Sequence, residues 1–143
     1  MHKSLYFAAL LLLLPATLLA QNAPQKKKAP TKRPEPTVAN YVYGDQSERQ
    51  KFDFWQAQSK EPTPVVLLIQ GGGWVNGDKS GYGTNMIQPF LDEGISVAAI
   101  NYRFIAQAME QQVELPVQAC LHDAARALQT IRSKATEWNI APE

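Results

Sequence analysis

The sequence predicts an α/β domain with a mostly parallel central sheet and helices on both of its faces. Two apolar segments, residues 65–70 and 95–100, lack polar alternation, which is typical of strands buried on both faces. Residues 84–93 lie between them and place apolar side chains at helical spacing. A strand, a helix and a second strand in this order imply a parallel pair. A longer amphipathic helix is predicted from Pro116 to Trp138.

The remaining elements predict a sheet with one unprotected edge. Short strands are expected at residues 41–43 and 51–55, as an antiparallel pair that precedes the parallel strands. Gly94 is placed to end the first helix, and the segment that leads to Pro116 is expected to be a loop. Nothing in this order covers the free edge of residues 95–100, so the sequence predicts a truncated chain.

The N-terminal residues have a different composition. Residues 1–20 combine a short positive start, an apolar run and small residues before an expected cleavage after Ala20, which is the layout of a signal peptide. A membrane anchor is the alternative, although the apolar run is shorter than the ~20 residues that a span needs. Residues 21–37 alternate prolines with basic residues and are predicted to be a disordered linker. We therefore expect a secreted or periplasmic protein whose folded part is residues 38–143.

The linker and the folded part carry charges of opposite sign. The 143-residue chain has a net charge of +1. Residues 21–37 hold five basic residues and one acidic residue, whereas residues 38–143 hold eight basic and twelve acidic residues. This balance argues against nucleic acid as a partner of the folded part. The basic linker is either a solvated spacer or a contact for anionic envelope polymers or lipid headgroups.

The sequence offers little for metal or redox chemistry. Cys120 is the single cysteine, so no intrachain disulfide is expected, and its apolar neighbours on the predicted helix favour a buried thiol. His122 is the one histidine that follows the predicted signal peptide, and no group of residues has metal-ligand spacing. We expect neither a metal nor another cofactor.

Three glycines at the end of the first apolar strand are the most informative feature of the chain. Gly71, Gly72 and Gly73 can adopt positive φ, and without side chains their N–H groups can approach a ligand closely. The carboxyl end of a parallel strand is a common place for ligands to bind. The glycines therefore indicate a site for a negatively charged oxygen.

Two other interpretations of the glycines stay open at this point. They could form a loose turn that binds nothing. They could also belong to a phosphate-binding loop, because Gly72 and Gly77 have the spacing of that motif and Lys79 and Ser80 follow. However, Asp78 stands between Gly77 and Lys79, and its negative charge would face the phosphate.

The motifs in this order resemble the α/β-hydrolase esterases and lipases that carry a His-Gly-Gly-Gly loop, in particular their secreted carboxylesterase, acetyl-xylan and feruloyl esterase-like branch. The resemblance runs from Tyr41 to Glu143. The segments that carry it are residues 70–74, 77–79, 101–103, 116–126 and 138–143. It implies the N-terminal half of an α/β-hydrolase fold, truncated before the nucleophile elbow Gly-x-Ser-x-Gly.

The resemblance also implies roles for four residues of the glycine segment. Gly72 and Gly73 would form part of the oxyanion hole through their backbone N–H groups. Gln70 stands where the family has histidine. Because glutamine has both a donor and an acceptor, it either supports the loop as histidine does or marks a degenerate site. Trp74 either lines a substrate pocket or only packs beside the loop.

The function implied by the resemblance is that of a secreted serine ester hydrolase acting on short acyl or polysaccharide-linked esters. No serine of the chain lies in Gly-x-Ser-x-Gly, and His122 precedes the expected serine, so nucleophile, acid and histidine are not assigned here. The 143-residue chain alone is therefore predicted to be inactive. The alternative is a non-catalytic, α/β-hydrolase-like binding module of the cell envelope. In either case Arg103 and Asp123 are expected to form an ion pair, as the resemblance implies.

Overall fold

The computed structural model of the protein describes residues 32–141, so the predicted signal peptide and residues 21–31 of the predicted linker lie outside the described residues. The strands are β1 (Val38–Val42), β2 (Lys51–Trp55), β3 (Val65–Ile69) and β4 (Ser96–Ile100). The helices are the 3₁₀ turn η1 (Lys79–Gly81), α1 (Thr84–Asp92), α2 (Ile105–Glu110) and α3 (Pro116–Ser133). None of the helices in residues 32–141 combines the length and apolar character that crossing a membrane requires.

The four strands form one sheet in the order β1-β2-β4-β3. The parallel pair that the sequence predicts is confirmed, because β3 and β4 run parallel from the Val65–Ser96 pair to the Ile69–Ile100 pair. The β1–β2 and β2–β4 pairings are antiparallel. The α/β class is therefore confirmed, whereas the sheet of the described residues is mixed and not mostly parallel.

The prediction that residues 95–100 form the open edge is wrong. β4 lies between β2 and β3, and all five of its residues are buried. The edge strand in the described residues is β3, whose first four residues are half-buried and whose Ile69 is 49% exposed. Both strands are continuous apolar runs, and such a run does not distinguish a central strand from an edge strand. The antiparallel addition of β2 to β4 decides the order.

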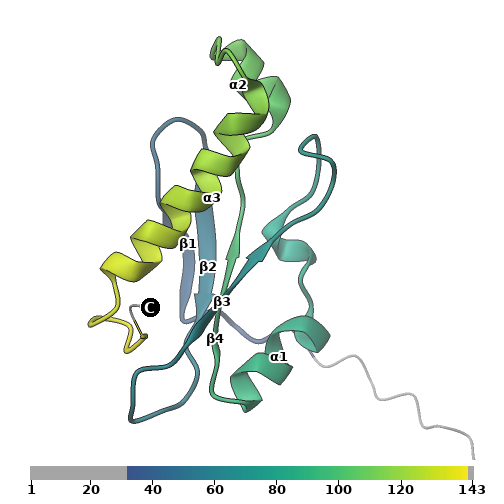
Figure 1. Cartoon of the computed structure of the whole chain (residues 1–143). Helices are drawn as coiled ribbons and strands as arrows, with labels where there is room; N and C mark the ends of the chain where they lie inside the picture. Colours follow the sequence, from purple (N-terminus) through teal and green to yellow (C-terminus); the bar gives the residue numbers. More distant parts are fainter. Residues whose placement is uncertain (1–31, 142–143) are drawn as a thin grey trace, which may run out of the picture. The chain divides into compact units, whose positions relative to one another are not determined.

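Helices cover both faces of the sheet, as predicted (Figure 1). On one face, α3 packs over a core that includes Phe52, Phe54, Ile100, Ile131 and Trp138. On the other face, α1 packs over a smaller core that includes Trp55, Ile87, Val97 and Ala99. The two cores fix the sheet between the helices, and the carboxyl ends of β3 and β4 lead into the segments described below.

The predicted helices differ from the observed ones mainly at their ends. Gly94 ends α1 as expected, with φ of 73° and its N–H donating to the carbonyl of Leu91. However, α3 ends at Ser133 and not near Trp138. Residues 134–139 continue as turns, from which Trp138 stacks on Phe54 with 4.7 Å between ring centroids. The apolar spacing of α3 continues past Ser133 because the turns of residues 134–139 place Trp138 in the same core that α3 covers.

Helix α2 lies in a segment that the sequence predicts to be a loop. This helix has six residues, which is too few for a clear periodic signal. Gln107 stabilises its start, because its Oε1 accepts the backbone N–H of Phe104 at 3.0 Å. Ala108 is the buried residue of this helix.

Residues 32–37 have no regular secondary structure, yet three of them contact the end of β2. The guanidinium of Arg33 lies 4.8 Å from the centroid of the Trp55 ring. The indole N–H of Trp55 donates to the Pro34 carbonyl at 2.9 Å, and Thr37 Oγ1 accepts the N–H of Gln56 at 3.0 Å. Packing onto the domain therefore begins at Arg33, within the segment that the sequence assigns to the linker.

Candidate active site

The segment that follows β3, residues 70–78, is referred to below as the glycine loop. Three consecutive residues of this loop take positive φ: 123° at Gly72, 61° at Gly73 and 63° at Trp74. A Cβ on Gly72 would lie 2.2 Å from the carbonyl oxygen of Asn76, and one on Gly77 would lie 2.6 Å from that of Gly71. Glycine is therefore required at positions 72 and 77 by the close approach of the backbone.

The conformation of the glycine loop leaves backbone donors unused. The carbonyl of Gly72 accepts the N–H groups of Val75 and Asn76, which closes a turn. Within residues 32–141, neither the N–H of Gly72 nor that of Gly73 donates to a protein acceptor. Both glycines are exposed, so these donors are available at the carboxyl end of a parallel strand. An arrangement of this kind can bind a negatively charged oxygen.

Two residues that follow β4 hold the glycine loop in place. The phenol of Tyr102 donates to the Gln70 carbonyl at 2.9 Å, and burial raises the pKa of this phenol, which keeps it protonated. Asn101 accepts the N–H of Lys79 at 2.7 Å and donates to Asp78 Oδ2 at 2.7 Å. These contacts anchor the loop at its first residue and at its end.

The carboxylate of Asp78 belongs to the same anchoring. Partial burial acts to raise the pKa of Asp78, but hydrogen bonds from Ser80 and Asn101 outweigh it, so the pKa lies below its ordinary value. The side chain of Asp78 caps η1 by accepting the N–H of Ser80 at 2.9 Å. The carboxylate of Asp78 is thus hydrogen-bonded to both Ser80 and Asn101.

Lys79 is not available to a phosphate group. Its Nζ lies 2.7 Å from Asp53 Oδ1 and 2.9 Å from Asn40 Oδ1, and the lysine is 7% exposed. Arg33 contacts the other oxygen of Asp53 at 3.2 Å. Since a phosphate-binding loop needs its lysine on the phosphate, this geometry excludes that interpretation.

The side chain of Gln70 does not brace the loop. Gln70 is 6% exposed, and neither its Nε2 nor its Oε1 has a hydrogen-bond partner in the described residues. Its main-chain carbonyl accepts the hydroxyl of Tyr102. Within residues 32–141 the loop is held by Tyr102 and Asn101 and not by the Gln70 amide.

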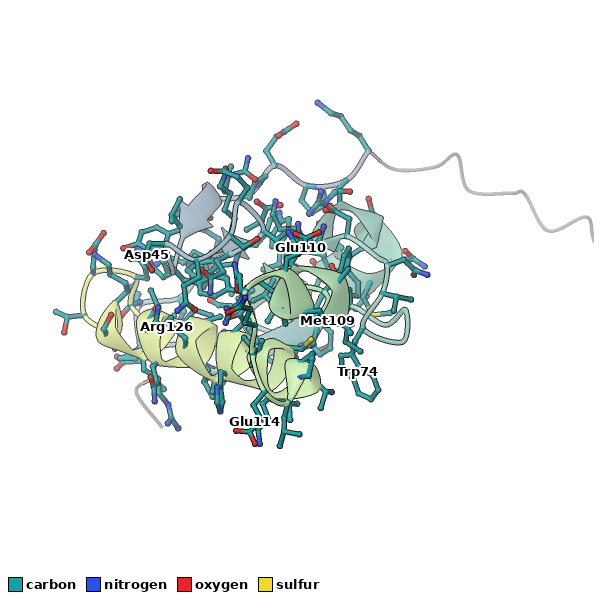
Figure 2. The ribbon with its side chains drawn as sticks, turned by 90° about the horizontal axis from the view of Figure 1, so that it is seen from above. Asp45, Trp74, Met109, Glu110, Glu114 and Arg126 are labelled. Carbon is teal, nitrogen blue, oxygen red and sulfur yellow. The ribbon has the colours of Figure 1, made fainter. Side chains whose placement is uncertain are left out.

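Trp74 is held by its backbone and not by packing of its ring. Its carbonyl accepts the N–H of Ile105 at 3.0 Å, which ties the glycine loop to the first residue of α2. The side chain is 47% exposed, and Figure 2 shows it projecting from the ribbon on the same side as Met109. Its position beside the free N–H groups of Gly72 and Gly73 allows contact with a ligand.

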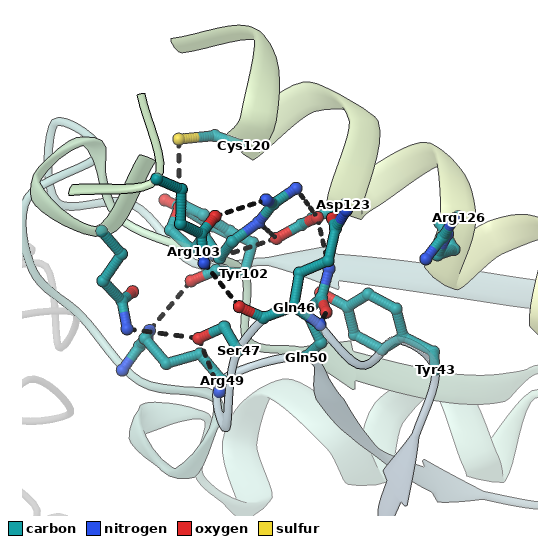
Figure 3. Close-up of polar contacts among 12 residues, drawn as sticks. Tyr43, Gln46, Ser47, Arg49, Gln50, Tyr102, Arg103, Cys120, Asp123 and Arg126 are labelled. Atoms are coloured by element: carbon teal, nitrogen blue, oxygen red, sulfur yellow. Dashed lines mark hydrogen bonds and ion pairs between the residues drawn. The ribbon is translucent and has the colours of Figure 1, made fainter. Parts of the chain in front are cut away.

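Arg103 and Asp123 form a buried, bidentate ion pair (Figure 3). Arg103 Nη2 lies 2.7 Å from Asp123 Oδ1, and Arg103 Nε lies 3.0 Å from Oδ2. The backbone N–H of Arg103 and the amide of Gln50 complete four hydrogen bonds to this carboxylate. These bonds to Asp123 raise the pKa of Arg103. The pair joins the segment after β4 to α3, and none of these four bonds involves a residue of the glycine loop.

The remaining candidate residues have no catalytic arrangement in the described residues. Cys120 is buried as predicted, its thiol donates to the Arg103 carbonyl at 3.1 Å, and burial raises its pKa. His122 lines a depression of about 270 Å³ with Gln46 and Arg126, and no lining residue of that depression belongs to the glycine loop. In residues 32–141, no serine hydroxyl bonds to an imidazole.

Sequence reasoning missed the residues that anchor the loop from other elements. Arg49, in the turn between β1 and β2, donates to the Gly77 carbonyl at 2.9 Å. Asp53 is buried in β2 against Lys79. The carboxylate of Asp53 between Phe52 and Phe54 could have been noticed in the sequence, because a charge in an apolar strand needs a partner. That the partner is Lys79 follows only from the folded structure.

The chain matches known proteins along most of its described part. The BD-FAE family model matches residues 53–143. An isoprenylcysteine alpha-carbonyl methylesterase of Arabidopsis thaliana is 36% identical over 102 residues, which cover 71% of this chain and 20% of that protein. A probable isoprenylcysteine alpha-carbonyl methylesterase of rice, Oryza sativa subsp. japonica, is 35% identical over 70 residues, which cover 49% of this chain and 17% of that protein. The chain thus spans about a fifth of the length of these relatives.

A solved structure shows the same fold. The truncated form of a carbohydrate esterase from gut microbiota superposes with a TM-score of 0.60 at 24% identity, covering 79% of this chain and 40% of that chain. The match of the family model covers more than half of the chain and includes the glycine loop with Asn101 and Tyr102, whereas Arg49 lies before its first residue. The chain belongs to the BD-FAE family, an α/β-hydrolase esterase family.

Proposed function

We propose that the full-length protein is a secreted serine ester hydrolase and that this chain supplies the oxyanion-binding part of its site. The observation that carries the proposal is the pair of unused N–H groups of Gly72 and Gly73 at the carboxyl end of β3. Membership of an esterase family supports ester hydrolysis as the reaction. The predicted signal peptide supports secretion.

The proposed reaction uses these N–H groups when negative charge develops. A serine Oγ outside the described residues attacks the ester carbonyl carbon, and a neighbouring base takes its proton. The carbonyl oxygen becomes an oxyanion, to which Gly72 and Gly73 donate. One such donor stabilises the transition state by about 3 kcal/mol. The tetrahedral intermediate expels the alcohol, and water then releases the acid from the acyl-enzyme.

The proposed substrates are esters with short acyl groups, including polysaccharide-linked ones. The relatives are named as methylesterases, which supports a small ester group, and the solved structure is named as a carbohydrate esterase, which supports a polysaccharide-linked ester. The half-exposed ring of Trp74 beside the glycines offers an apolar contact for the substrate. Its exposure also suits a wide, open site better than a deep acyl tunnel.

The test is a profile of the full-length protein on nitrophenyl esters from acetyl to dodecanoyl. We expect turnover with a maximum at acetyl or propionyl and its loss when the elbow serine is replaced by alanine. The chain of residues 1–143 serves as the matched control and should show no serine-dependent burst. A maximum at octanoyl or longer would contradict the substrate class, and absence of turnover would contradict the reaction.

A second candidate function is a non-catalytic binding module of the cell envelope, with the basic linker on anionic polymers. The observation that favours it is the unpaired amide of Gln70 where the resembled esterases have histidine. It predicts that the full-length protein binds polysaccharide or peptidoglycan without releasing nitrophenol. Steady release of nitrophenol that depends on the elbow serine would exclude it.

A further inference from the structure

We propose that Arg49 is a positioning residue that fixes the glycine loop from outside the loop and its neighbouring strands. The proposal rests on the proposed function, since it concerns the geometry of the Gly72 and Gly73 donors. Arg49 lies in the turn between β1 and β2, a region that the sequence does not connect with the site.

Three contacts of Arg49 converge on the site. Its Nη2 donates to the Gly77 carbonyl at 2.9 Å, and its Nε donates to the Tyr102 carbonyl at 2.9 Å. Its guanidinium carbon lies 3.7 Å from the centroid of the Phe104 ring. One side chain therefore joins the last turn of the glycine loop to the segment between β4 and α2 (Figure 3 shows the bond to Tyr102).

The loop is then held at both of its ends through Tyr102. The phenol of Tyr102 donates to the Gln70 carbonyl at the start of the loop. The carbonyl of Tyr102 accepts a hydrogen bond from Arg49, and Arg49 in turn donates to the Gly77 carbonyl at the end of the loop. The backbone at Gly77 packs closely against Gly71, since a Cβ on Gly77 would lie 2.6 Å from the Gly71 carbonyl oxygen. A shift of Gly77 is therefore transmitted to Gly71 and to the donors that follow it.

Arg49 is itself oriented by the surrounding turns. Its backbone N–H donates to Ser47 Oγ at 3.1 Å, and the amide of Gln107 donates to the same oxygen at 3.2 Å. Gln107 also caps the start of α2 through Phe104. The β1–β2 turn and α2 thus fix the backbone of Arg49 through Ser47, and α2 also holds the loop through Trp74.

The chemistry of these contacts requires arginine. A guanidinium presents several N–H donors in a fixed plane, so it can reach two carbonyls and stack on a ring at once. A lysine ammonium has the charge but not the planar fork. Because Arg49 is only partly buried, we expect its removal to affect the geometry of the loop more than the stability of the fold.

The experiment compares R49A, R49K and the control R132A in the full-length protein. Arg132 is exposed on α3 and distant in sequence from the loop, so R132A should leave kcat unchanged. For R49A we expect kcat to fall by about 10- to 100-fold with KM nearly unchanged, because small misplacement of a catalytic group costs this much. R49K should recover little, whereas guanidinium ion added to R49A should restore part of kcat. A purely structural role predicts lower stability with unchanged kcat in the folded fraction, and that result would overturn the proposal.

A second measurement does not depend on activity. In the protein labelled with ¹⁵N-glycine, R49A should shift the amide signals of Gly72, Gly73 and Gly77 and leave those of Gly81 and Gly94 in place. If the wild-type protein lacks turnover but these signals shift, the proposed function fails while the role of Arg49 stands. If R49A leaves the three loop signals unchanged, the role of Arg49 is wrong whatever the activity.

Discussion

Two glutamine side chains are buried in the described part of the chain, and their surroundings are opposite. Gln50 is fully buried; its amide donates to Asp123 Oδ1 at 2.7 Å, and its carbonyl oxygen accepts the N–H of Gln46 at 2.8 Å. Gln70 is 6% exposed, and both polar atoms of its amide lack a partner. The first belongs to the Arg103–Asp123 network, and the second begins the glycine loop.

This difference separates scaffold from site. In the network every oxygen lone pair of Asp123 is used, which is what a buried charge needs. In the glycine loop the Gly72 and Gly73 donors and the Gln70 amide are left unused within residues 32–141. A buried polar group without a partner costs stability, which applies to the Gln70 amide. The Gly72 and Gly73 donors are exposed and stay open to another molecule. The following experiments test this contrast, from the largest expected effect to the smallest.

Removal of Asp123 should produce the largest loss of stability. Asp123→Ala leaves the guanidinium of Arg103, which is 5% exposed, without its charge partner. We expect the free energy of unfolding to fall by about 3–5 kcal/mol. Urea unfolding of the full-length protein measures this. Asp45→Ala is the control, since Asp45 is 94% exposed and lies 4.0 Å from Arg126; its effect should be small. Equal effects of the two variants would contradict the network.

An added methyl group should distinguish two neighbouring glycines. At Gly72 a Cβ meets the Asn76 carbonyl oxygen at 2.2 Å and φ is 123°, whereas at Gly71 it meets nothing within 4 Å and φ is not positive. If the glycine loop binds the oxyanion, Gly72→Ala should lower kcat by about 10²-fold or more, while Gly71→Ala retains most of it. Initial rates on nitrophenyl acetate measure both. Similar losses in both variants would show that the loop does not act through its conformation.

The elements of the fold could be predicted largely from apolar spacing. Residues 84–93 and 116–133 place apolar side chains at helical spacing, and Gly94 marks the end of the first helix. What spacing could not provide was strand order. The central position of β4 and the edge position of β3 depend on β2, which pairs with β4 from far along the chain. The six-residue α2 was also beyond reach, because a helix of this length has too few turns to show a period.

The site was predictable in its backbone and not in its anchors. A run of glycines after a strand predicts positive φ and free N–H groups. Gly72 and Gly73 have positive φ. Arg49 contacts the loop from 28 positions away and Tyr102 from 32, and the two bond to each other across 53 positions. No local pattern encodes such pairs. The amide of Gln70 has a donor and an acceptor, but whether they are used depends on neighbours from other segments.

Replacement of Gln50 by methionine should cost an intermediate amount. Methionine has a similar length but removes the donor to Asp123 and the acceptor for Gln46. A hydrogen bond to a charged group contributes about 1.5–3 kcal/mol, so we expect a loss of about 2 kcal/mol in urea unfolding. A loss below about 0.5 kcal/mol would mean that water replaces the amide in this network.

The same substitution at Gln70 should have the smallest effect, with the opposite sign. In the described residues, Gln70→Met removes an amide that is buried without a partner, and replacing such a group by an apolar one is neutral or stabilises by about 1 kcal/mol. Urea unfolding of the full-length protein, compared with Gln50→Met under the same conditions, measures the difference. A loss comparable to that of Gln50→Met would contradict this expectation and would indicate a partner for the Gln70 amide outside residues 32–141. Polysaccharide binding by Gln70→Met, compared with the unchanged protein, then identifies that partner. Weaker binding indicates a contact with the ligand, whereas lower stability with unchanged binding indicates a contact within the protein.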